Sequence, residues 1–537
     1  MVKKSEHLDI GAMETWLWDA ACSLRGAQDA PKYKDFIFPL VFFKRLSDVF
    51  DDEFTQYIEQ FGDENIAREI VEQDHADALK NNRKPMVRFY IPREYSWNKL
   101  RNYGQQSGDS GGKKRTLGEF VTDAMREVAR MNPDLQGVVD VKDYNERQSG
   151  QRTIDDDRLA KLIEVISRHR LGLKNAEPDI LGRAYEYLLR KFAEGQGQSA
   201  GEFFTPKEVG WLMARILDPK PRTTVYDPTC GSAGLLIKTR LHYEMAHPAK
   251  RAQAPKLYGQ EAMATTYAIA KMNMFLHDYM DSYFAIGDTF RSPGFAAEGA
   301  GLKRFDYVVA NPMWNQGKDS LPYLGEDFYA NDRYNRFIKF PPDDNADWGW
   351  LQHIWASLND TGRASVVLDT GAVSRGSGSQ NKSRERDARQ YFVENDWIEG
   401  VVLLPDNLFY NTTAAGILVF LNKAKPKERK NKIILINAST YFDKEKPKNV
   451  LRIGDDIANV VSTFQQWKEI DKLSKIITLK DAKATDYNLS PSQYVENGEA
   501  ASHRSLPHIL EDLNRARAER EQADKELDDL LKKLKVA

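Results

Sequence analysis

Apolar residues recur at helical spacing from the beginning of the chain. Between Met13 and Phe54 they form two groups, separated near Pro31: Trp16, Leu17, Ala20, Ala21 and Leu24, then Phe36, Phe38, Leu40, Phe43 and Leu46. This spacing predicts two helices with a break between them. A Gly- and Ser-rich stretch at 101–114 predicts a mobile surface loop, and helical patterns resume from Leu117. We expect an all-α N-terminal domain over residues 1–195.

A second Gly-rich break, at 194–202, precedes a change of pattern to short apolar runs separated by helical segments. These runs are TTVYD at Thr223, KLYGQE at Lys256, YFAIGD at Tyr283, FDYVVANP at Phe305, RASVVLD at Arg363, IEGVVLLP at Ile398 and GILVFLN at Gly416. The alternation is typical of a largely parallel sheet covered on both faces. It predicts a doubly wound, Rossmann-like α/β catalytic domain over residues 196–425, with its last strand ending near Asn422 and a C-terminal extension over 426–503.

Residues 504–537 are polar and helix-prone, with apolar positions at heptad spacing. One series is Leu506, Leu513, Arg520, Leu527 and Leu534, and a second, three residues on, is Ile509, Ala516, Ala523 and Leu530. The pattern predicts a coiled-coil-like helix that docks onto a partner, with a solvated self-packing segment as the alternative.

The composition narrows the class of protein. The chain of 537 residues has 77 Lys and Arg against 79 Asp and Glu, so it lacks a strong overall positive field for nucleic acid. Its only cysteines, Cys22 and Cys230, lack metal-ligand spacing, so we expect no metal site and a reducing cytoplasm. No apolar run reaches the ~20 residues that span a bilayer, and the start does not resemble a signal peptide. We expect a cytoplasmic protein without membrane contact.

The segment VYDPTCGSAGLL, 225–236, predicts a cofactor loop. It reads as a strand that ends at Asp227, a turn of small residues and the start of a helix. Gly231 and Gly234 allow close approach of a ligand, and the helix N-terminus offers free amides. The turn matches neither the dinucleotide nor the P-loop pattern, so NAD and ATP are poorer candidates than another nucleoside-bearing cofactor. A plain strand-to-helix turn is the alternative.

Two further acids follow later strands. Glu261 ends the run KLYGQE, and Asp288 follows AIG. Because the carboxyl ends of parallel strands meet at one edge of a sheet, these acids and Asp227 are expected to face one ligand. Carboxylates suit sugar hydroxyls and amino groups. Asp288 also suits a cap of the turn TFRSP, and this alternative stays open.

The segment FDYVVANPMW, 305–314, indicates the reaction. An aromatic amine is a poor nucleophile, because its lone pair is delocalised into the ring. The Asn311 side-chain oxygen and the Pro312 carbonyl are suited to accept both amine hydrogens, and Trp314 to stack on a flipped base. Orientation for in-line displacement then carries much of the catalysis. Asn-Pro is also a common turn, which is the alternative for the tetrapeptide alone.

At this point the chain resembles the modification subunits of Type I restriction-modification systems. The similar segments are 16–48 in their helical domain, 179–209 at their domain junction, and DPTCGSAGLL with NPMW in their catalytic motifs. The resemblance implies S-adenosylmethionine-dependent methylation of adenine N6 in DNA. It assigns Asn311, Pro312 and Trp314 to the target base, and it assigns to the cofactor Phe204, Thr205, Pro206, Asp227, Thr229, Gly231, Ser232, Glu261 and Asp288.

The resemblance also implies partners. These are double-stranded DNA, a specificity subunit that reads the sequence, usually with two modification subunits to each, and a restriction subunit with ATPase and nuclease activities. The 115 residues after Asn422 leave little room for a recognition domain, which agrees with a separate specificity subunit.

Two motifs depart from the family pattern. Met313 and Trp314 stand where Asn-Pro-Pro-Phe or Tyr is usual, and Ala233 stands where a glycine is usual. Similar motifs occur in enzymes that methylate cytosine N4 or a protein glutamine, and a non-catalytic clamp subunit is a further alternative. In LPDNLFYNTTAAG, 404–416, Phe409 or Tyr410 is expected either at the base or in the core. DWGWLQHIW, 347–355, is expected beside the site without a catalytic role.

Overall fold

A computed structural model of the chain gives the fold. It describes residues 8, 10–25, 32–81, 83, 85–106, 115–148, 150–176, 184, 187–188, 205–279, 281–296, 301–379, 383–409, 412–445, 448–452, 454–496 and 520. Residues 1–495 form one compact unit and residues 496–537 a second. The helix expected over 504–537 lies outside the described residues except for Arg520, so its docking role stays a prediction.

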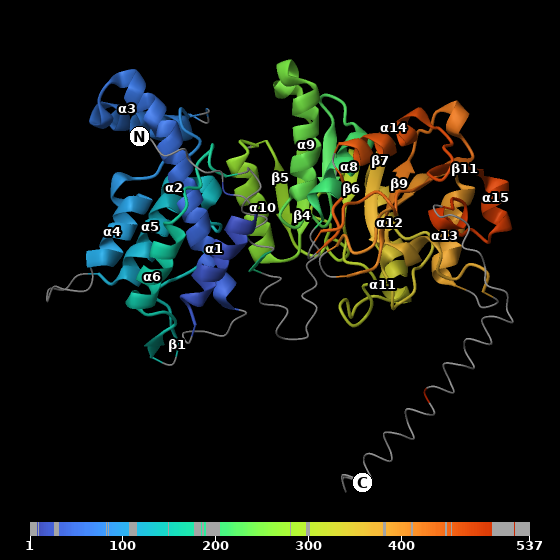
Figure 1. The fold of residues 1–537 in the computed structure, drawn as a ribbon, viewed down its shortest axis with the longest axis horizontal. Helices are drawn as coiled ribbons and strands as arrows, with labels where there is room; N and C mark the ends of the chain where they lie inside the picture. Colours follow the sequence, from blue (N-terminus) through green and yellow to red (C-terminus); the bar gives the residue numbers. More distant parts are fainter. Residues whose placement is uncertain are drawn as a thin grey trace, which may run out of the picture. The chain divides into compact units, whose positions relative to one another are not determined.

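The N-terminal part of the chain is helical, as the apolar spacing predicts (Figure 1). Its helices are α1 (Ile10–Cys22), α2 (Tyr33–Phe61), α3 (Glu64–Lys80), α4 (Trp97–Gln106), α5 (Leu117–Met131) and α6 (Asp156–Ile166), with short turns η2 (Arg93–Tyr95) and η3 (Pro133–Leu135) and a small hairpin of β1 (Arg147–Gln148) and β2 (Gln151–Arg152). The loop expected at 101–114 is wrong for its first part, because Arg101–Gln106 complete α4. Residues 107–114 and the junction at 194–202 lie outside the described residues.

A nine-stranded sheet forms the second part of the fold, in the order β11-β10-β8-β9-β7-β6-β3-β4-β5. Its strands are β3 (Thr224–Asp227), β4 (Lys256–Glu261), β5 (Tyr283–Ile286), β6 (Phe305–Ala310), β7 (Leu358–Asp369), β8 (Ile398–Leu403), β9 (Gly416–Asn422), β10 (Lys432–Asn437) and β11 (Ser474–Thr478). Neighbours are parallel except that β9 runs antiparallel to β7 and β8, and β11 runs antiparallel to β10. The predicted α/β class is therefore confirmed. The expectation that the last strand ends near Asn422 is wrong, since β10 and β11 extend the sheet.

Helices cover both faces of this sheet. One face carries α8 (Lys207–Leu217), α9 (Gly234–Ala246), α10 (Ala264–Leu276) and α14 (Asp455–Gln466), and the other α12 (Asp347–Ser357), α13 (Arg384–Glu394) and α15 (Leu479–Ala484). Successive strand residues alternate between the two cores: Val225 and Val309 lie in the first, Tyr226 and Val308 in the second. This alternation explains the continuous apolar runs, because strands buried on both faces have no polar side.

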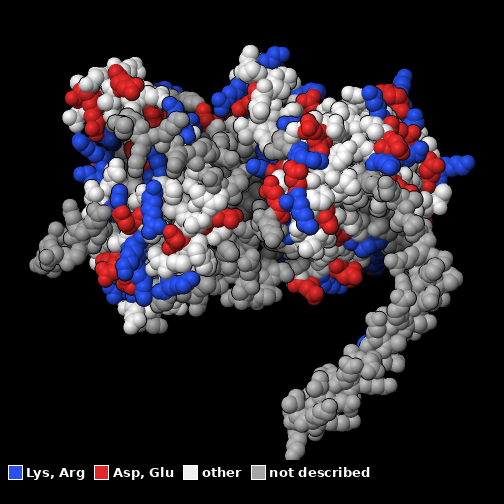
Figure 2. Space-filling view, in the orientation of Figure 1, with Lys and Arg blue, Asp and Glu red and all other residues white. Residues whose placement is uncertain are grey.

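Shorter elements complete the fold: α11 (Glu326–Ala330), η4 (Pro248–Gln253), η5 (Thr370–Val373), η6 (Lys427–Arg429) and η7 (Pro491–Gln493). On the face drawn in Figure 2, basic and acidic side chains of the described residues are interspersed. That face shows no extended surface of a single sign. In the described part of the chain, no helix is long and apolar enough to cross a membrane.

Candidate active site

The candidate residues follow strands that end at one edge of the sheet, around the carboxyl ends of β3 and β6. These strands lie side by side and parallel in the centre of the sheet, and the helices that follow them cover opposite faces. Ligands of open α/β sheets bind at such a switch point. The loop after β3 carries 228–233, the ends of β4 and β5 bring Glu261 and Asp288, and the turn after β6 carries 311–316. The strand order therefore places these strand ends at one edge of the sheet, and that their side chains face one ligand stays a prediction.

Backbone amides and carboxylates hold the loop after β3 in shape. Asp227 is buried and accepts a hydrogen bond from the Thr229 amide at 3.0 Å. Glu261 accepts from the Gly231 amide at 3.0 Å and, through its other oxygen, from the Met263 amide at 2.9 Å. Glu261 thus ties the end of β4 to the loop after β3, which fixes the distance between the two cofactor candidates.

Burial perturbs the acid groups of this loop. Desolvation raises the pKa of Asp227 to about 8, and it also raises the pKa of Glu261. The same burial, together with both carboxylates, raises the pKa of the Cys230 thiol well above its usual value. Among the described residues, the groups that act on the pKa of Asp227 include Thr229 and Glu261 but no lysine or arginine. A cationic ligand bound beside Asp227 would therefore stabilise the ionised form of its carboxylate and lower its pKa.

The loop also has the space and the polar atoms that a cofactor needs. Gly231 has a φ of +53°, and a side chain added there would meet nothing within 4 Å. The Thr229 side chain lies beside Asp227 and acts on the pKa of its carboxyl group. Ser232 is anchored through its carbonyl, which accepts from Asn273 Nδ2 at 2.9 Å. Open space beside buried carboxylates fits a cofactor with hydroxyl and amino groups.

Asp288 caps the turn that follows β5, as the alternative interpretation predicted. One carboxylate oxygen accepts from the amides of Phe290 at 2.8 Å and Arg291 at 3.3 Å. The Tyr323 hydroxyl donates to the other oxygen. The role of Asp288 toward the cofactor stays a prediction. A cofactor that contacts Asp288 would share its carboxylate with these three donors.

The Asn-Pro turn after β6 presents a polar atom in an apolar setting. Asn311 is buried, and its side-chain nitrogen donates to the Thr205 hydroxyl at 2.9 Å. Its side-chain oxygen is buried without a hydrogen-bond partner among the described residues. Pro312 is buried beside it, and Pro206 caps the start of α8 next to Thr205. Sequence reasoning placed Thr205 at the cofactor and missed its contact with Asn311; Phe204 lies outside the described residues.

Trp314 packs against Phe409 from the loop before β9. The ring centroids are 4.9 Å apart at an interplanar angle of 68°, and Phe409 is 1% exposed. Phe409 also lies against Gly416, where an added Cβ would be 2.5 Å from its ring. The core interpretation of Phe409 is favoured, since it supports Trp314 from within the fold. Tyr410 lies outside the described residues.

The two departures from the family pattern have different structural settings. Met313 is half-buried, and its sulfur accepts from Gln316 Nε2 at 3.6 Å. Ala233 has a φ of +67° and is fully buried in the core that α8, α9 and α10 share. A left-handed alanine is strained relative to glycine, but its buried methyl recovers part of that cost by packing.

The doubly wound sheet, with the loop after β3 and the Asn-Pro turn after β6 at one edge, is typical of S-adenosylmethionine-dependent methyltransferases. The sequence family described as N-6 DNA Methylase matches residues 176–503, and the HsdM N-terminal domain matches residues 13–166. The chain belongs to the N-6 DNA methylase family. It is a DNA methyltransferase of this family, whose cofactor is S-adenosylmethionine.

Named relatives agree with this assignment. The chain is 33% identical over 409 residues to the Type I restriction enzyme MjaVIII methylase subunit of Methanocaldococcus jannaschii, covering 74% of this chain and 67% of that protein. It spans 63% of the length of the MjaVII methylase subunit from the same organism, at 33% identity over 70% of this chain. It is also 26% identical over 538 residues to the MpnII methylase subunit of Mycoplasma pneumoniae, covering 95% of each chain.

A solved structure shares the fold. The type I restriction-modification methyltransferase subunit from Streptococcus thermophilus superposes with a TM-score of 0.72 at 24% sequence identity, covering 91% of this chain and all of that one. The chain is thus similar over most of its length to Type I methylase subunits, which confirms the resemblance drawn from its motifs.

Proposed function

We propose that this chain transfers a methyl group from S-adenosylmethionine to adenine N6 in DNA, as the modification subunit of a Type I restriction-modification complex. The observation that carries the proposal is the Asn311 side chain. Its nitrogen donates to the Thr205 hydroxyl, and its oxygen is buried without a hydrogen-bond partner among the described residues. A buried acceptor without a donor is costly, so a site that keeps one has a use for it.

The chemistry of the target side follows from these groups. The Asn311 oxygen and the Pro312 carbonyl accept the hydrogens of the adenine amino group, which directs its lone pair out of the ring plane. The ring face of Trp314 stacks on the flipped base. S-adenosylmethionine supplies an electrophilic methyl group when bound. Because no strong base is needed, a neutral asparagine suffices where a charged residue would be expensive to bury.

We assign the cofactor side to the acids and the loop between them. Glu261 binds the ribose hydroxyls, Asp288 faces the adenine ring, and the loop after β3 borders the methionine part through Asp227, Thr229, Gly231 and Ser232. Phe204, Thr205 and Pro206 enclose the cofactor from the junction before α8. The raised pKa of Asp227 supports this assignment, because a cationic amino acid moiety stabilises a carboxylate that burial otherwise disfavours.

We also propose the partners of a modification subunit. A separate specificity subunit reads the DNA sequence and binds two copies of this chain, and a restriction subunit joins the complex. The support is the similarity to named Type I methylase subunits, together with a solved type I assembly that covers 97% of this chain at a TM-score of 0.55 and 17% identity.

The test is radiolabelled methyl transfer to DNA by the chain co-expressed with its specificity subunit, followed by digestion to nucleosides. Asn311→Ala should lower transfer by more than about 100-fold and change the affinity for S-adenosylmethionine by less than about twofold. Trp314→Ala should lower turnover by about 10- to 100-fold, and Trp314→Phe should restore most of it.

A matched control is Asn359→Ala. Asn359 also bonds through its side chain, to Asp306 at 2.6 Å, but at the amino end of the sheet. Asn359→Ala should leave methyl transfer unchanged. Full activity in Asn311→Ala would contradict the mechanism, and N4-methylcytosine among the products would contradict the substrate.

A further inference from the structure

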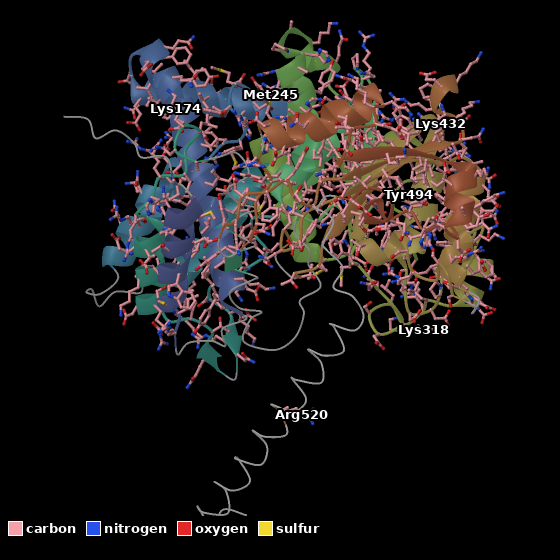
Figure 3. The ribbon with its side chains drawn as sticks, turned by 45° about the vertical axis from the view of Figure 1, so that its right-hand side comes forward. Lys174, Met245, Lys318, Lys432, Tyr494 and Arg520 are labelled. Atoms are coloured by element: carbon pink, nitrogen blue, oxygen red, sulfur yellow. The ribbon has the colours of Figure 1, made fainter. Side chains whose placement is uncertain are left out.

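The turn that carries Asn311 and Trp314 is fastened to the beginning of α12. Lys318, labelled in Figure 3, lies in the long connection that follows the turn and leads to α11 and α12. Hydrogen bonds at the end of this connection return to the turn: Asn315 N to Asp347 Oδ1 at 3.2 Å, Asn345 Nδ2 to Asn315 Oδ1 at 2.8 Å, Ala346 N to Gln316 O at 2.7 Å, and Trp350 Nε1 to Gln316 Oε1 at 3.1 Å. The sequence segment that begins at Asp347 therefore contacts the site directly.

The contacts of Asn345, Ala346, Asp347 and Trp350 with the turn form a clamp, in which Asp347 is the charged residue. Its side chain is 0% exposed, and its second oxygen pairs with Arg375 at 2.5 Å. Arg375 also pairs with Asp369 at 2.9 Å and Glu385 at 2.8 Å, so its guanidinium is held by carboxylates from three segments. Burying a carboxylate is expensive unless its partners are fixed. Arg375 thus locks the position of Asp347, and through it the position of the Asn315 amide.

The turn needs such support. Asn315 has a φ of +54°, a left-handed conformation that asparagine adopts more readily than other residues with a side chain and that local hydrogen bonds stabilise. It directly follows Trp314, so relaxation at Asn315 would redirect the ring that stacks on the base. Asn345 holds the Asn315 side chain and also accepts from the Asp347 amide at 2.9 Å, which joins both contacts in one unit.

We propose that Asp347, held by Arg375, is a positioning residue for the target-base pocket. Through the turn it orients Trp314 and Asn311, and it does not contact the base. This inference rests on the proposed function. Misplacement of reacting groups by about 1 Å costs up to about 100-fold in rate, so loss of the clamp should lower kcat. The cofactor loop after β3 belongs to another element and should keep its affinity.

The experiment compares Asp347→Asn with Glu385→Gln in the complex with the specificity subunit. Both variants neutralise a carboxylate on the same arginine, but in the described part of the chain only Asp347 reaches the turn. Asp347→Asn should lower kcat by about 10- to 100-fold, with the affinity for S-adenosylmethionine within about twofold. Glu385→Gln should keep kcat within about twofold.

A spectroscopic readout separates positioning from a loss of stability. DNA with 2-aminopurine at the methylated position gains fluorescence when the base leaves the stack. Asp347→Asn should bind this DNA and give a weaker or altered emission at a temperature where thermal unfolding shows it folded. Asn345→Ala cuts the same clamp without removing a charge and should reproduce the effect if Asp347→Asn does not fold.

Equal losses of kcat in Asp347→Asn and Glu385→Gln, or an unchanged kcat in folded Asp347→Asn and Asn345→Ala, would overturn the positioning role. An active Asn311→Ala would instead overturn the proposed function. The two failures are therefore distinguishable.

Discussion

The proposed cofactor side and the proposed target side of the candidate site differ in their electrostatics. On the cofactor side, Asp227 and Glu261 are carboxylates whose pKa values burial raises, and each already accepts from a loop amide. On the target side, Asn311 is neutral, and its oxygen has no partner among the described residues. Two acid groups that burial tends to keep protonated lie where we place a cationic cofactor, and a neutral amide lies where we place an uncharged amine.

The difference shows how the side chains on each side are held in position before a ligand binds. The carboxylates are fixed by the loop that they organise, so their geometry does not depend on a ligand. Asn311 is fixed through its nitrogen by Thr205, which leaves its oxygen free to act. Variants that affect one side and spare the other test this division.

After Asn311→Ala, the largest effect is expected from Glu261→Ala. The change removes the proposed ribose contact and the acceptor of the Gly231 amide, and a charged hydrogen bond contributes about 1.5–3 kcal/mol. We expect affinity for S-adenosylmethionine to fall by about 10- to 100-fold in calorimetry. The control is Asp306→Asn, a carboxylate at the amino end of the sheet that accepts from the Thr224 amide at 2.8 Å. Equal affinities for Glu261→Ala and the unchanged chain would move the cofactor elsewhere.

Asp227→Asn should weaken cofactor binding by about tenfold and stabilise the free chain. The pKa of Asp227 is about 8 in the fold and 3.8 in its usual state, so between these values the folded chain keeps a proton that the unfolded chain loses. Its contribution to stability is thus complete below about pH 4 and is lost as the pH rises to about 8. Thermal unfolding should show the advantage of the variant growing from pH 5.5 to 8. A lower Tm than the unchanged chain at pH 8 would contradict this assignment.

Thr205→Val should have the smallest effect and is the sharpest test of the division. It removes the acceptor of the Asn311 amide, a bond that contributes about 0.5–1.5 kcal/mol, so kcat should fall by about 2- to 10-fold. Thr205→Ser keeps the hydroxyl and should behave like the unchanged chain. If Thr205→Val instead weakened S-adenosylmethionine binding at constant kcat, Thr205 would belong to the cofactor side alone.

The local pattern of the sequence was sufficient for much of the fold. The apolar runs that end at Asp227, Glu261 and Asn311 are strands at the expected positions, because strands buried on both faces leave a continuous apolar signal. The run KIILIN, which forms β10, carries the same signal and was overlooked. The strand β11 (Ser474–Thr478) is less evident, since it lies at the edge of the sheet and only Ser474 and Ile477 of its residues are buried.

Contacts between distant segments could not be predicted in this way. The Asn311 side chain donates to the Thr205 hydroxyl, which lies 106 positions earlier in the chain. The Tyr323 hydroxyl donates to Asp288 from a connection whose sequence has neither helical nor strand periodicity. Asp347 was assigned no role, because no local pattern shows that its carboxylate accepts from Asn315. Such pairs depend on how loops close over the sheet, and that information is absent from a single sequence without relatives.

The raised pKa of Cys230 has a consequence for the durability of the enzyme. A methyl donor alkylates thiolates readily, and Cys230 stands in the loop assigned to that donor. Its burial and the two carboxylates near it raise the pKa of the thiol, which disfavours the thiolate that would react with a methyl donor. A thiol reagent should accordingly modify the half-buried Cys22 of the folded chain and spare Cys230.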